Sequence, residues 1–194
     1  MKIEIRYAKL EDAARLVEIY CYYVEKTAIT FEYEVPAVEE FQQRMVHVME
    51  KYPYLVAKVD DQIVGYAYAG TFNVRAAYDW CVETSIYVDH TLRKCGVGKR
   101  LYQALEKALK AQNITNLNAC ISSPIQNDEY LDTNSIDYHL GYQMVGEFHQ
   151  CGYKFKRWYN MVWMEKFIGE HHENQLSMIQ FNEIKDQVNL NEVD

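Results

Sequence analysis

The chain has 194 residues, of which 49% are hydrophobic and 25% charged, so a single globular domain with a full hydrophobic core accounts for nearly all of it. The net charge of −8 disfavours a nucleic-acid partner, because the overall field repels phosphates. No apolar run approaches the ~20 residues that a membrane span requires, and the N-terminus lacks the pattern of a secretion signal. We therefore expect a cytoplasmic protein with neither a membrane nor a nucleic acid as partner.

The five cysteines lie far apart and form no C-x-x-C pair. That spacing fits neither a zinc site nor a disulfide framework, so we predict reduced thiols and no metal. Seventeen residues are tyrosines. We expect most of them to be half-buried core residues whose hydroxyls reach water, with a few lining a pocket.

The first half of the chain predicts strands and two helices. Residues 3–7 alternate apolar and polar side chains, as a half-buried strand does. From Leu10, apolar residues recur at three- and four-residue steps and predict an amphipathic helix, and Pro36 can open a second one. Residues 54–70 form two predicted strands around an acidic turn.

The second half predicts further strands around one long helix. The elements are, in order, a loop over 72–79, an apolar strand over 80–88, a helix from Val97 to about Asn113, a strand over 116–122, a short helix over 134–139, and strands over 142–149 and 158–165. The acidic tail, 167–194, has few strong apolar anchors, so we expect a loosely docked helix or disorder there. This order predicts an α/β sheet, mostly antiparallel, with helices on its faces.

The stretch LRKCGVGKRLYQALEKAL, residues 92–109, places two glycines where a strand gives way to a helix. Glycines let the backbone fold closely around a guest, and the start of a helix carries partial positive charge, so the turn suits a phosphate. Arg93 stands where a Walker loop has its first glycine, and Leu101 stands at the third glycine of the dinucleotide fingerprint. The stretch does fit a third phosphate-binding pattern, R/Q-x-x-G-x-G/A. The alternative to a phosphate site is a structural glycine turn that carries solvated basic residues.

Arg93-x-x-Gly96-x-Gly98 after the strand SIYV resembles the acyl-coenzyme A pyrophosphate loop of the GNAT superfamily of N-acetyltransferases. Other stretches are similar, in order, to its phosphinothricin and methionine sulfoximine acetyltransferase branch. They are ITFEYEVP, YPYLVAKVDDQIVGYAYAG, RAAYDWCVETSIYV, NSIDYHLGY and CGYKFKRWYNMVWME. The resemblance implies a domain over 1–166 with the GNAT fold: a mixed, mostly antiparallel twisted sheet, a V-shaped splay between central strands, and helices on both faces. Residues 167–194 would be a C-terminal extension.

The resemblance implies acetyl-CoA as co-substrate, lying in the splay. Its pantetheine arm would pair with strand backbone, its pyrophosphate would sit on the glycine turn, and the N–H of Ile86 or a neighbour would polarise the acetyl carbonyl. The implied cofactor-binding residues are Ile86, Tyr87, Val88, Arg93, Lys94, Cys95, Gly96, Val97, Gly98, Lys99, Asn134 and Ser135.

The chemistry needs a base, because an amine is mostly protonated at neutral pH and cannot attack a thioester. The resemblance places that base at Glu83, where partial burial would raise the pKa of the carboxyl group; an outward-facing glutamate is the alternative. His139 corresponds to a family histidine that assists acid/base steps, and Tyr138 can instead protonate the departing thiolate. Family members usually carry two more residues between that histidine and LGY, so the predicted helix here is about half a turn shorter.

Substrate recognition follows from the same resemblance. Arg75 matches an arginine that faces the substrate carboxylate, and its planar fork suits that group. Phe31 and Glu32 resemble the loop over the amino-acid site. Trp158 and Tyr159 look like residues that the partner subunit contributes, so a homodimer is implied. For each of these residues, the alternative is a side chain that only packs against its neighbours and binds no substrate.

These residues support three hypotheses. The favoured one is an enzyme that acetylates the amine of a small amino acid or analogue by direct attack in a ternary complex, since no cysteine lies beside an evident base. A second keeps the cofactor but takes a protein N-terminus or a polyamine as acceptor, which Arg75 disfavours. The third is a non-catalytic acyl-CoA-binding module, because fold and ligand site alone do not establish chemistry.

Overall fold

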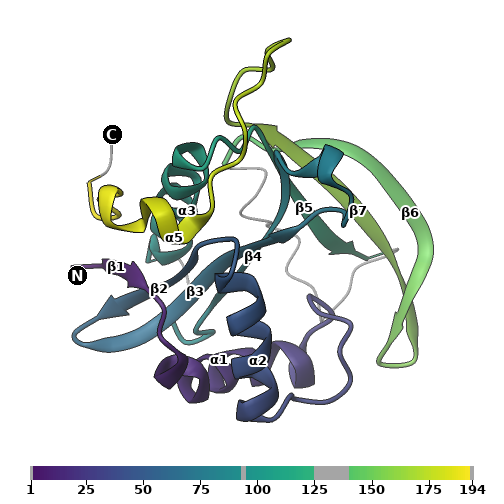
Figure 1. Ribbon diagram of the computed structural model, residues 1–194. Helices are drawn as coiled ribbons and strands as arrows, with labels where there is room; N and C mark the ends of the chain where they lie inside the picture. The colour runs from purple at the N-terminus through teal and green to yellow at the C-terminus, as the bar shows by residue number, and fades with distance from the viewer. Residues whose placement is uncertain (1, 93–94, 125–139, 193–194) are drawn as a thin grey trace.

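The computed structural model describes residues 2–92, 95–124 and 140–192 (Figure 1). In this part of the chain, strands form one sheet in the order β1-β2-β3-β4-β5-β7-β6. The strands are β1 (Glu4–Tyr7), β2 (Tyr54–Val59), β3 (Gln62–Thr71), β4 (Cys81–Val88), β5 (Asn116–Ser123), β6 (Gln143–Lys154) and β7 (Arg157–Phe167). The helices are α1 (Ala13–Lys26), α2 (Val38–Met49), α3 (Val97–Ala111) and α5 (Phe181–Ile184), with short 3-10 turns at Leu10–Asp12, Ala76–Tyr78 and Lys185–Gln187.

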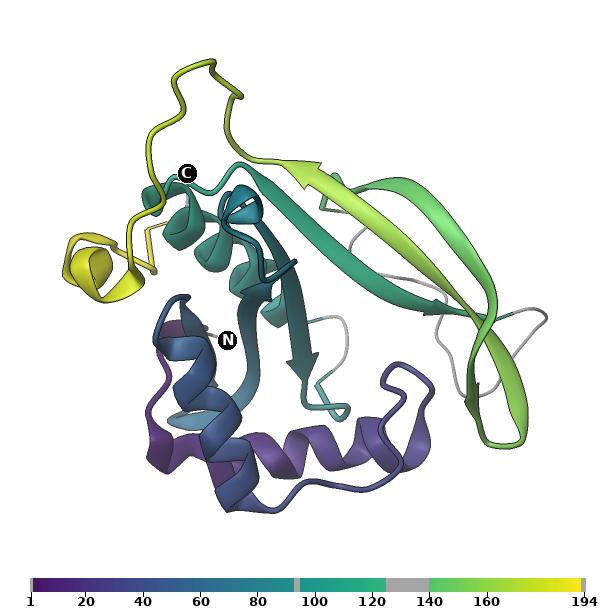
Figure 2. The same ribbon diagram turned by 45° about the vertical axis from the view of Figure 1, so that its right-hand side comes forward.

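The sheet splits at its centre. Neighbouring described strands run antiparallel except β4 and β5, which are parallel because α3 crosses over between them. These two pair only where Cys81–Glu83 meets Asn116–Asn118, and beyond that point they diverge (Figure 2). The predicted fold is therefore confirmed, including the V-shaped splay.

Helices cover both faces of the sheet, with α1 and α2 on one and α3 on the other (Figure 1). Strand alternation sends Tyr54 and Tyr66 toward α1 and α2, while Leu55 and Ala67 pack with α3. A Cβ added at Gly65 would lie 3.2 Å from Leu101 Cδ1 and 3.0 Å from a backbone oxygen of β4. A glycine here lets α3 pack closely on the sheet.

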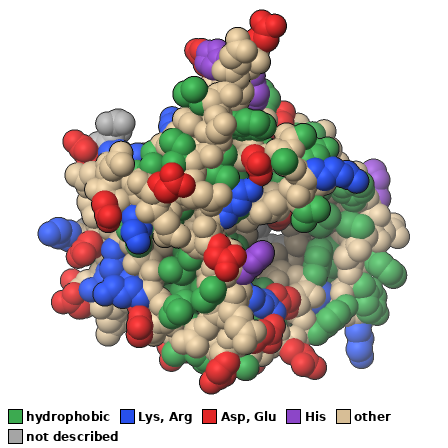
Figure 3. All heavy atoms as spheres, viewed as in Figure 1, with side chains coloured by type: hydrophobic (Ala, Val, Ile, Leu, Met, Phe, Trp, Pro, Cys, Tyr) green, Lys and Arg blue, Asp and Glu red, His purple; other side chains and the backbone are tan. Residues whose placement is uncertain are grey.

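The hairpin β6–β7 extends away from the rest of the molecule (Figure 2). Both strands are longer than the sequence predicts, and Phe155 and Lys156 form the tight turn with φ of 50° and 60°. Hydrophobic side chains gather over this side of the molecule (Figure 3), where Met144, Val145 and Phe148 are exposed.

The tail after β7 is anchored more firmly than we expected. Phe181, Ile184 and Leu190 are buried, and the side-chain amide of Asn191 bonds both backbone groups of Ile5 at 2.8 and 2.9 Å. A few well-placed apolar residues and one amide thus compensate for the polar composition of the tail. No helix in the described ranges is long and apolar enough to cross a membrane.

Candidate active site

Glu83 lies in the middle of β4, at the last position where that strand pairs with β5. Strand alternation puts it on the face toward α1 and α2, together with Ser85 and Tyr87. The side chain is half-buried and makes no hydrogen bond or ion pair with any other described residue. Burial raises the pKa of its carboxyl group, so this carboxylate holds a proton more readily than an exposed one would.

The backbone of β4 has an open edge next to Glu83. The N–H of Asp89 bonds to Val64 in β3, so the backbone groups of Ile86 and Val88 point the other way, toward the splay. The hydroxyl of Tyr23, from α1, donates to the Val88 carbonyl at 2.5 Å and accepts from the Val88 N–H at 3.3 Å. Ile86 is therefore the position on this edge that no described strand or tyrosine covers.

The glycine turn opens α3. Gly96 caps the helix with φ of 80°, a conformation that favours glycine, and Val97 and Gly98 are buried in the first turn. The N–H groups of the first residues of a helix lack intrahelical partners and can bind an anion. Cys95 and Lys99 are exposed on either side of this turn.

Two thiols lie near Glu83. Cys81 is two residues earlier on the same face and accepts a hydrogen bond from the Asn118 amide, with 2.9 Å between nitrogen and sulfur. Burial, reinforced by the charge of Glu83, raises the pKa of Cys120 to about 12, and burial also raises the pKa of Cys81. Both thiols therefore stay protonated at neutral pH and are poor nucleophiles.

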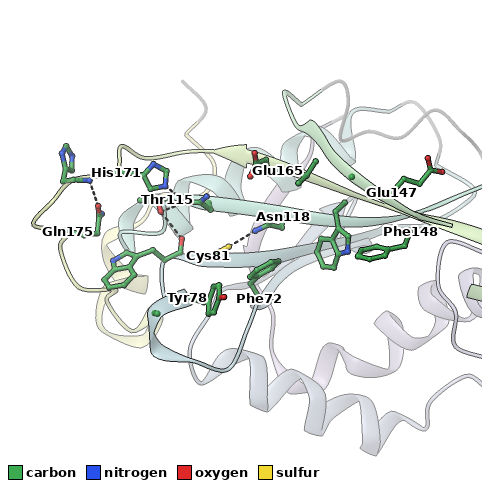
Figure 4. Close-up of a pocket in the computed structure, with 17 residues that line it drawn as sticks. Phe72, Tyr78, Cys81, Thr115, Asn118, Glu147, Phe148, Glu165, His171 and Gln175 are labelled. Carbon is green, nitrogen blue, oxygen red and sulfur yellow. Dashed lines mark hydrogen bonds between the residues drawn. The ribbon is translucent and has the colours of Figure 1, made fainter. Parts of the chain in front are cut away.

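A groove of about 860 Å³ lies above the first residues of β4 and β5 (Figure 4). Phe72, Tyr78 and Trp163 give it an aromatic wall, and Cys81 and Asn118 lie on its floor. Its other rim comes from β6 and from the tail, including His171, whose ring lies 2.7 Å from the side-chain oxygen of Asn116. The groove is open to solvent next to the three residue pairs that join β4 to β5, Cys81–Glu83 with Asn116–Asn118.

Residues 5–163 match the Acetyltransferase (GNAT) domain family. The chain belongs to this family. A phosphinothricin N-acetyltransferase of Streptomyces viridochromogenes is 34% identical over 168 residues, covering 85% of this chain and 88% of that protein. An L-methionine sulfoximine/L-methionine sulfone acetyltransferase of Pseudomonas aeruginosa is 31% identical, covering 85% and 94%. A crystal structure of a phosphinothricin acetyltransferase from Sinorhizobium meliloti in complex with AcCoA superposes with a TM-score of 0.81 at 28% identity, covering 93% and 99%.

In this acetyltransferase, the loop between α1 and α2 is fastened to the β6–β7 hairpin. The ring of Phe31 lies against Gly152, where an added Cβ would come within 2.3 Å of it, and also packs on Tyr159. The buried side chain of Lys154 donates to the Thr30 carbonyl at 2.7 Å. Loop and hairpin are therefore held together as one unit.

The predicted substrate residues fall into different environments. Glu32 forms an ion pair with Arg44 at 2.7 Å, while Arg75 is exposed at the start of a 3-10 turn and its side chain bonds no other described residue. Trp158 is exposed, but Tyr159 is buried. Both belong to β7, at the start of the strand that the sequence predicts over 158–165.

Several predicted site residues lie outside the described ranges: Arg93, Lys94, Asn134, Ser135, Tyr138 and His139.

Sequence reasoning missed Tyr23 and Lys154, whose partners are distant in the chain. Two tyrosines are exceptions to the expectation that most tyrosine hydroxyls reach water, namely Tyr52 and Tyr66. Both are buried without a hydrogen-bond partner in the described part of the chain. A signal for Tyr66 was present, because it and Tyr68 are two residues apart and so share one face of a strand.

Proposed function

We propose that this acetyltransferase transfers the acetyl group of acetyl-CoA to the amine of a small amino acid or amino-acid analogue. The observation that carries the proposal is the position of Glu83, a half-buried carboxylate at the point where β4 and β5 part. A carboxylate with a raised pKa is suited to accept the proton of an ammonium at the moment of attack.

The fit of acetyl-CoA rests on two features. The open edge of β4 at Ile86 offers an N–H to the acetyl carbonyl, where it would stabilise the charge that develops on oxygen during attack. The start of α3, with Gly96 in the left-handed region, offers N–H groups to the pyrophosphate. The two sites lie on consecutive elements, at the end of β4 and the beginning of α3. The complex of the Sinorhizobium meliloti relative with AcCoA supports this assignment.

We infer direct transfer in a ternary complex. Glu83 takes a proton from the ammonium, and the freed amine nitrogen attacks the thioester carbon. The carbon–sulfur bond then breaks, and the second proton that nitrogen loses passes to the leaving sulfur, so that coenzyme A departs as the thiol. The high pKa values of Cys81 and Cys120 disfavour a covalent acetyl-cysteine.

The acceptor class follows from Arg75 and from the relatives. Arg75 lies in the loop that leads into β4, and its free guanidinium suits a carboxylate. The related proteins are named for phosphinothricin and for methionine sulfoximine or sulfone. We also infer a homodimer, in which exposed Trp158 reaches the partner's site; Tyr159 is too buried to do so without rearrangement.

An acetyl-transfer assay with methionine sulfoximine, phosphinothricin, spermidine and an N-terminal peptide tests the proposal. We expect turnover of the first two and little of the others. Turnover of spermidine or of the peptide alone would show that the acceptor is a polyamine or a protein N-terminus and not a small amino acid. Calorimetric binding of acetyl-CoA without release of coenzyme A from any of the four would indicate a binding module.

A further inference from the structure

The first residues after β4 form a tight turn that one carboxylate organises. Oδ1 of Asp89 accepts hydrogen bonds from the N–H and the hydroxyl of Thr91, at 3.0 and 2.7 Å. The Asp89 N–H donates to the carbonyl of Val64 in β3 at 2.8 Å, and its own carbonyl accepts from the N–H of Leu92 at 2.9 Å. An aspartate that bonds the backbone two residues later is a common way to fix a turn. Asp89 therefore sets the direction in which the chain leaves β4.

The second oxygen of this carboxylate binds helix α1. Nη2 of Arg15 lies 2.5 Å from Asp89 Oδ2, and Nε of the same guanidinium donates to the Ile63 carbonyl in β3 at 3.0 Å. One planar group thus joins α1, β3 and the turn, a task that suits a fork of several donors better than a single ammonium nitrogen. Burial alone would raise the pKa of Asp89, but the hydrogen bonds from Thr91 and Arg15 outweigh it and lower this pKa. The carboxylate is therefore ionised at neutral pH.

Two further contacts hold the same turn. The ring of His90 stacks on that of Tyr22 in α1, with centroids 3.9 Å apart and planes 3° apart. The side chain of Leu92 packs against the core cluster that includes Val97 and Leu101 of α3. Figure 2 shows α1 passing next to the end of β4. The turn is thus anchored to α1 at its start and to the α3 side of the core at Leu92.

This turn joins the two places that the proposed function assigns to acetyl-CoA. The open edge of β4 at Ile86 precedes it, and α3 begins after it, with Gly96 as the cap. Both places would bind through backbone N–H groups, whose relative position depends on the connection between them. A ligand that contacts both needs them at a fixed separation. Any freedom of the turn would be lost on binding and would weaken the affinity.

The ion pair fixes the turn without using the groups that the cofactor would need. Arg15 bonds a side-chain oxygen of Asp89, and the Asp89 N–H points to β3 and away from the splay. The Tyr23 hydroxyl, by contrast, bonds the backbone groups of Val88 on the open edge. The Arg15–Asp89 bond can therefore persist when acetyl-CoA is bound. A partly exposed ion pair contributes little to stability, so its main effect is on the position of the turn.

We propose that Arg15 and Asp89 are positioning residues for acetyl-CoA, which hold the turn after β4 so that the edge at Ile86 and the start of α3 meet one ligand together. They act on the affinity for the cofactor and not on the acetyl transfer itself. The inference rests on the proposed function, since it requires acetyl-CoA at these two places.

The test removes the carboxylate and measures binding. We expect Asp89→Ala to raise the calorimetric Kd for coenzyme A and the KM for acetyl-CoA by roughly tenfold, with kcat changed by less than about twofold. Asp12→Ala is the matched control. Asp12 also bonds a backbone N–H, that of Lys9, and the guanidinium of Arg6, but it does so at the start of α1. The control should leave Kd and KM unchanged.

A donor without a diphosphate locates the effect. S-Acetylpantetheine keeps the arm and the thioester but lacks the group that would bind at α3. Its kcat/KM should be the same in the wild type and in Asp89→Ala. Arg15→Met leaves the bonds between Asp89 and Thr91 in place, and it should raise the KM for acetyl-CoA by a smaller factor, at least roughly threefold. This variant carries the test if Asp89→Ala does not fold.

The outcomes separate the two proposals. Unchanged Kd and KM in Asp89→Ala, or equal increases in Asp12→Ala, would overturn the inference. An equal loss of kcat/KM with both donors would indicate a general structural defect and overturn it too; if S-acetylpantetheine does not react at all, the Kd values of the two variants decide. If the wild type binds coenzyme A but acetylates no amino acid, the proposed acceptor is wrong, and the Kd values still test the inference. If the wild type does not bind coenzyme A, both proposals are overturned.

Discussion

The side-chain nitrogen of Lys154 donates a hydrogen bond to the backbone carbonyl oxygen of Thr30, with 2.7 Å between the atoms. Lys154 is 2% exposed, and burial lowers its pKa to about 8, although the nearby charge of Glu32 acts in the opposite direction. One buried lysine thus joins the end of β6 to the loop that carries Phe31 and Glu32.

The lowered pKa of Lys154 predicts an unusual pH dependence of stability. Between pH 8 and the unfolded-state pKa of 10.5, the unfolded chain holds a proton at this site that the folded chain has lost. The free energy of unfolding therefore rises with pH in this window, by on the order of 1 kcal/mol. Urea denaturation at pH 7.5 and 9.5 should show the wild type gaining stability relative to Lys154→Met. Lys110→Met, an exposed change, is the control; a parallel shift in both variants would contradict the prediction.

Replacing the proposed base should separate activity from stability. We expect Glu83→Gln to lower kcat about a hundredfold or more, with little change in acetyl-CoA binding, because only proton transfer is lost. The same variant should melt at a higher temperature at pH 7, because it removes a half-buried carboxylate whose pKa is raised by burial.

The wild-type rate provides a second check on Glu83. Activity needs the ionised carboxylate, so the rate should fall on the acid side through a pKa above 4.5. This acid limb should vanish in Glu83→Gln. The exposed Glu39→Gln should change neither rate nor melting temperature, and unchanged turnover in Glu83→Gln would remove this residue from the mechanism.

If acetyl-CoA pairs with β4 as proposed, Tyr23 competes with it for the backbone of Val88. Its hydroxyl bonds both backbone groups of Val88, the groups with which the pantetheine arm would pair. Tyr23→Phe should therefore lower KM for acetyl-CoA by roughly twofold to tenfold and leave kcat nearly unchanged. Tyr7→Phe, whose hydroxyl bonds Lys185 on the tail, is the control. If KM rises or stays constant, the cofactor does not displace Tyr23 from this edge.

Adding one methyl group at Gly152 should move the loop between α1 and α2. The new Cβ would overlap the ring of Phe31 at 2.3 Å, and the ring is the part that can swing away. We expect an increase in acceptor KM and a lower melting temperature, together reflecting about 1–3 kcal/mol of overpacking. Gly146→Ala in the same strand meets no atom within 4 Å and should have little effect. Equal behaviour of the two variants would show that Phe31 does not shape the acceptor site.

Local patterns in the sequence predicted much of the fold. The strand predicted over 80–88 is present as β4, and Glu83, Ser85 and Tyr87 share one of its faces because side chains in a strand alternate by geometry. The glycine turn before α3 was also visible, since Gly96 adopts a backbone angle that other residues avoid. Roles that depend on His139 and Tyr138 stay predictions, as both lie outside the described ranges.

Contacts between residues that are far apart in the chain could not be predicted from local sequence patterns. Lys154 and Thr30 are 124 positions apart, and Tyr23 and Val88 are 65 apart. Neither pair has a local signature, because its members meet only after the sheet and the helices have assembled. The lack of a partner for the Tyr66 hydroxyl results from how the folded protein packs. The sequence period predicts the face of the strand on which Tyr66 lies, but not the groups around its hydroxyl.

The Asn191 amide protects the β1 edge of the sheet from pairing with strands of other molecules. It occupies both backbone groups of Ile5, and Arg6 donates to the carbonyl of Tyr7 at 2.9 Å, so the outward groups at the β1 border are largely taken. A border without free donors and acceptors is a poor template for strand addition and aggregation. The opposite border of the described sheet, along β6, carries no comparable tail.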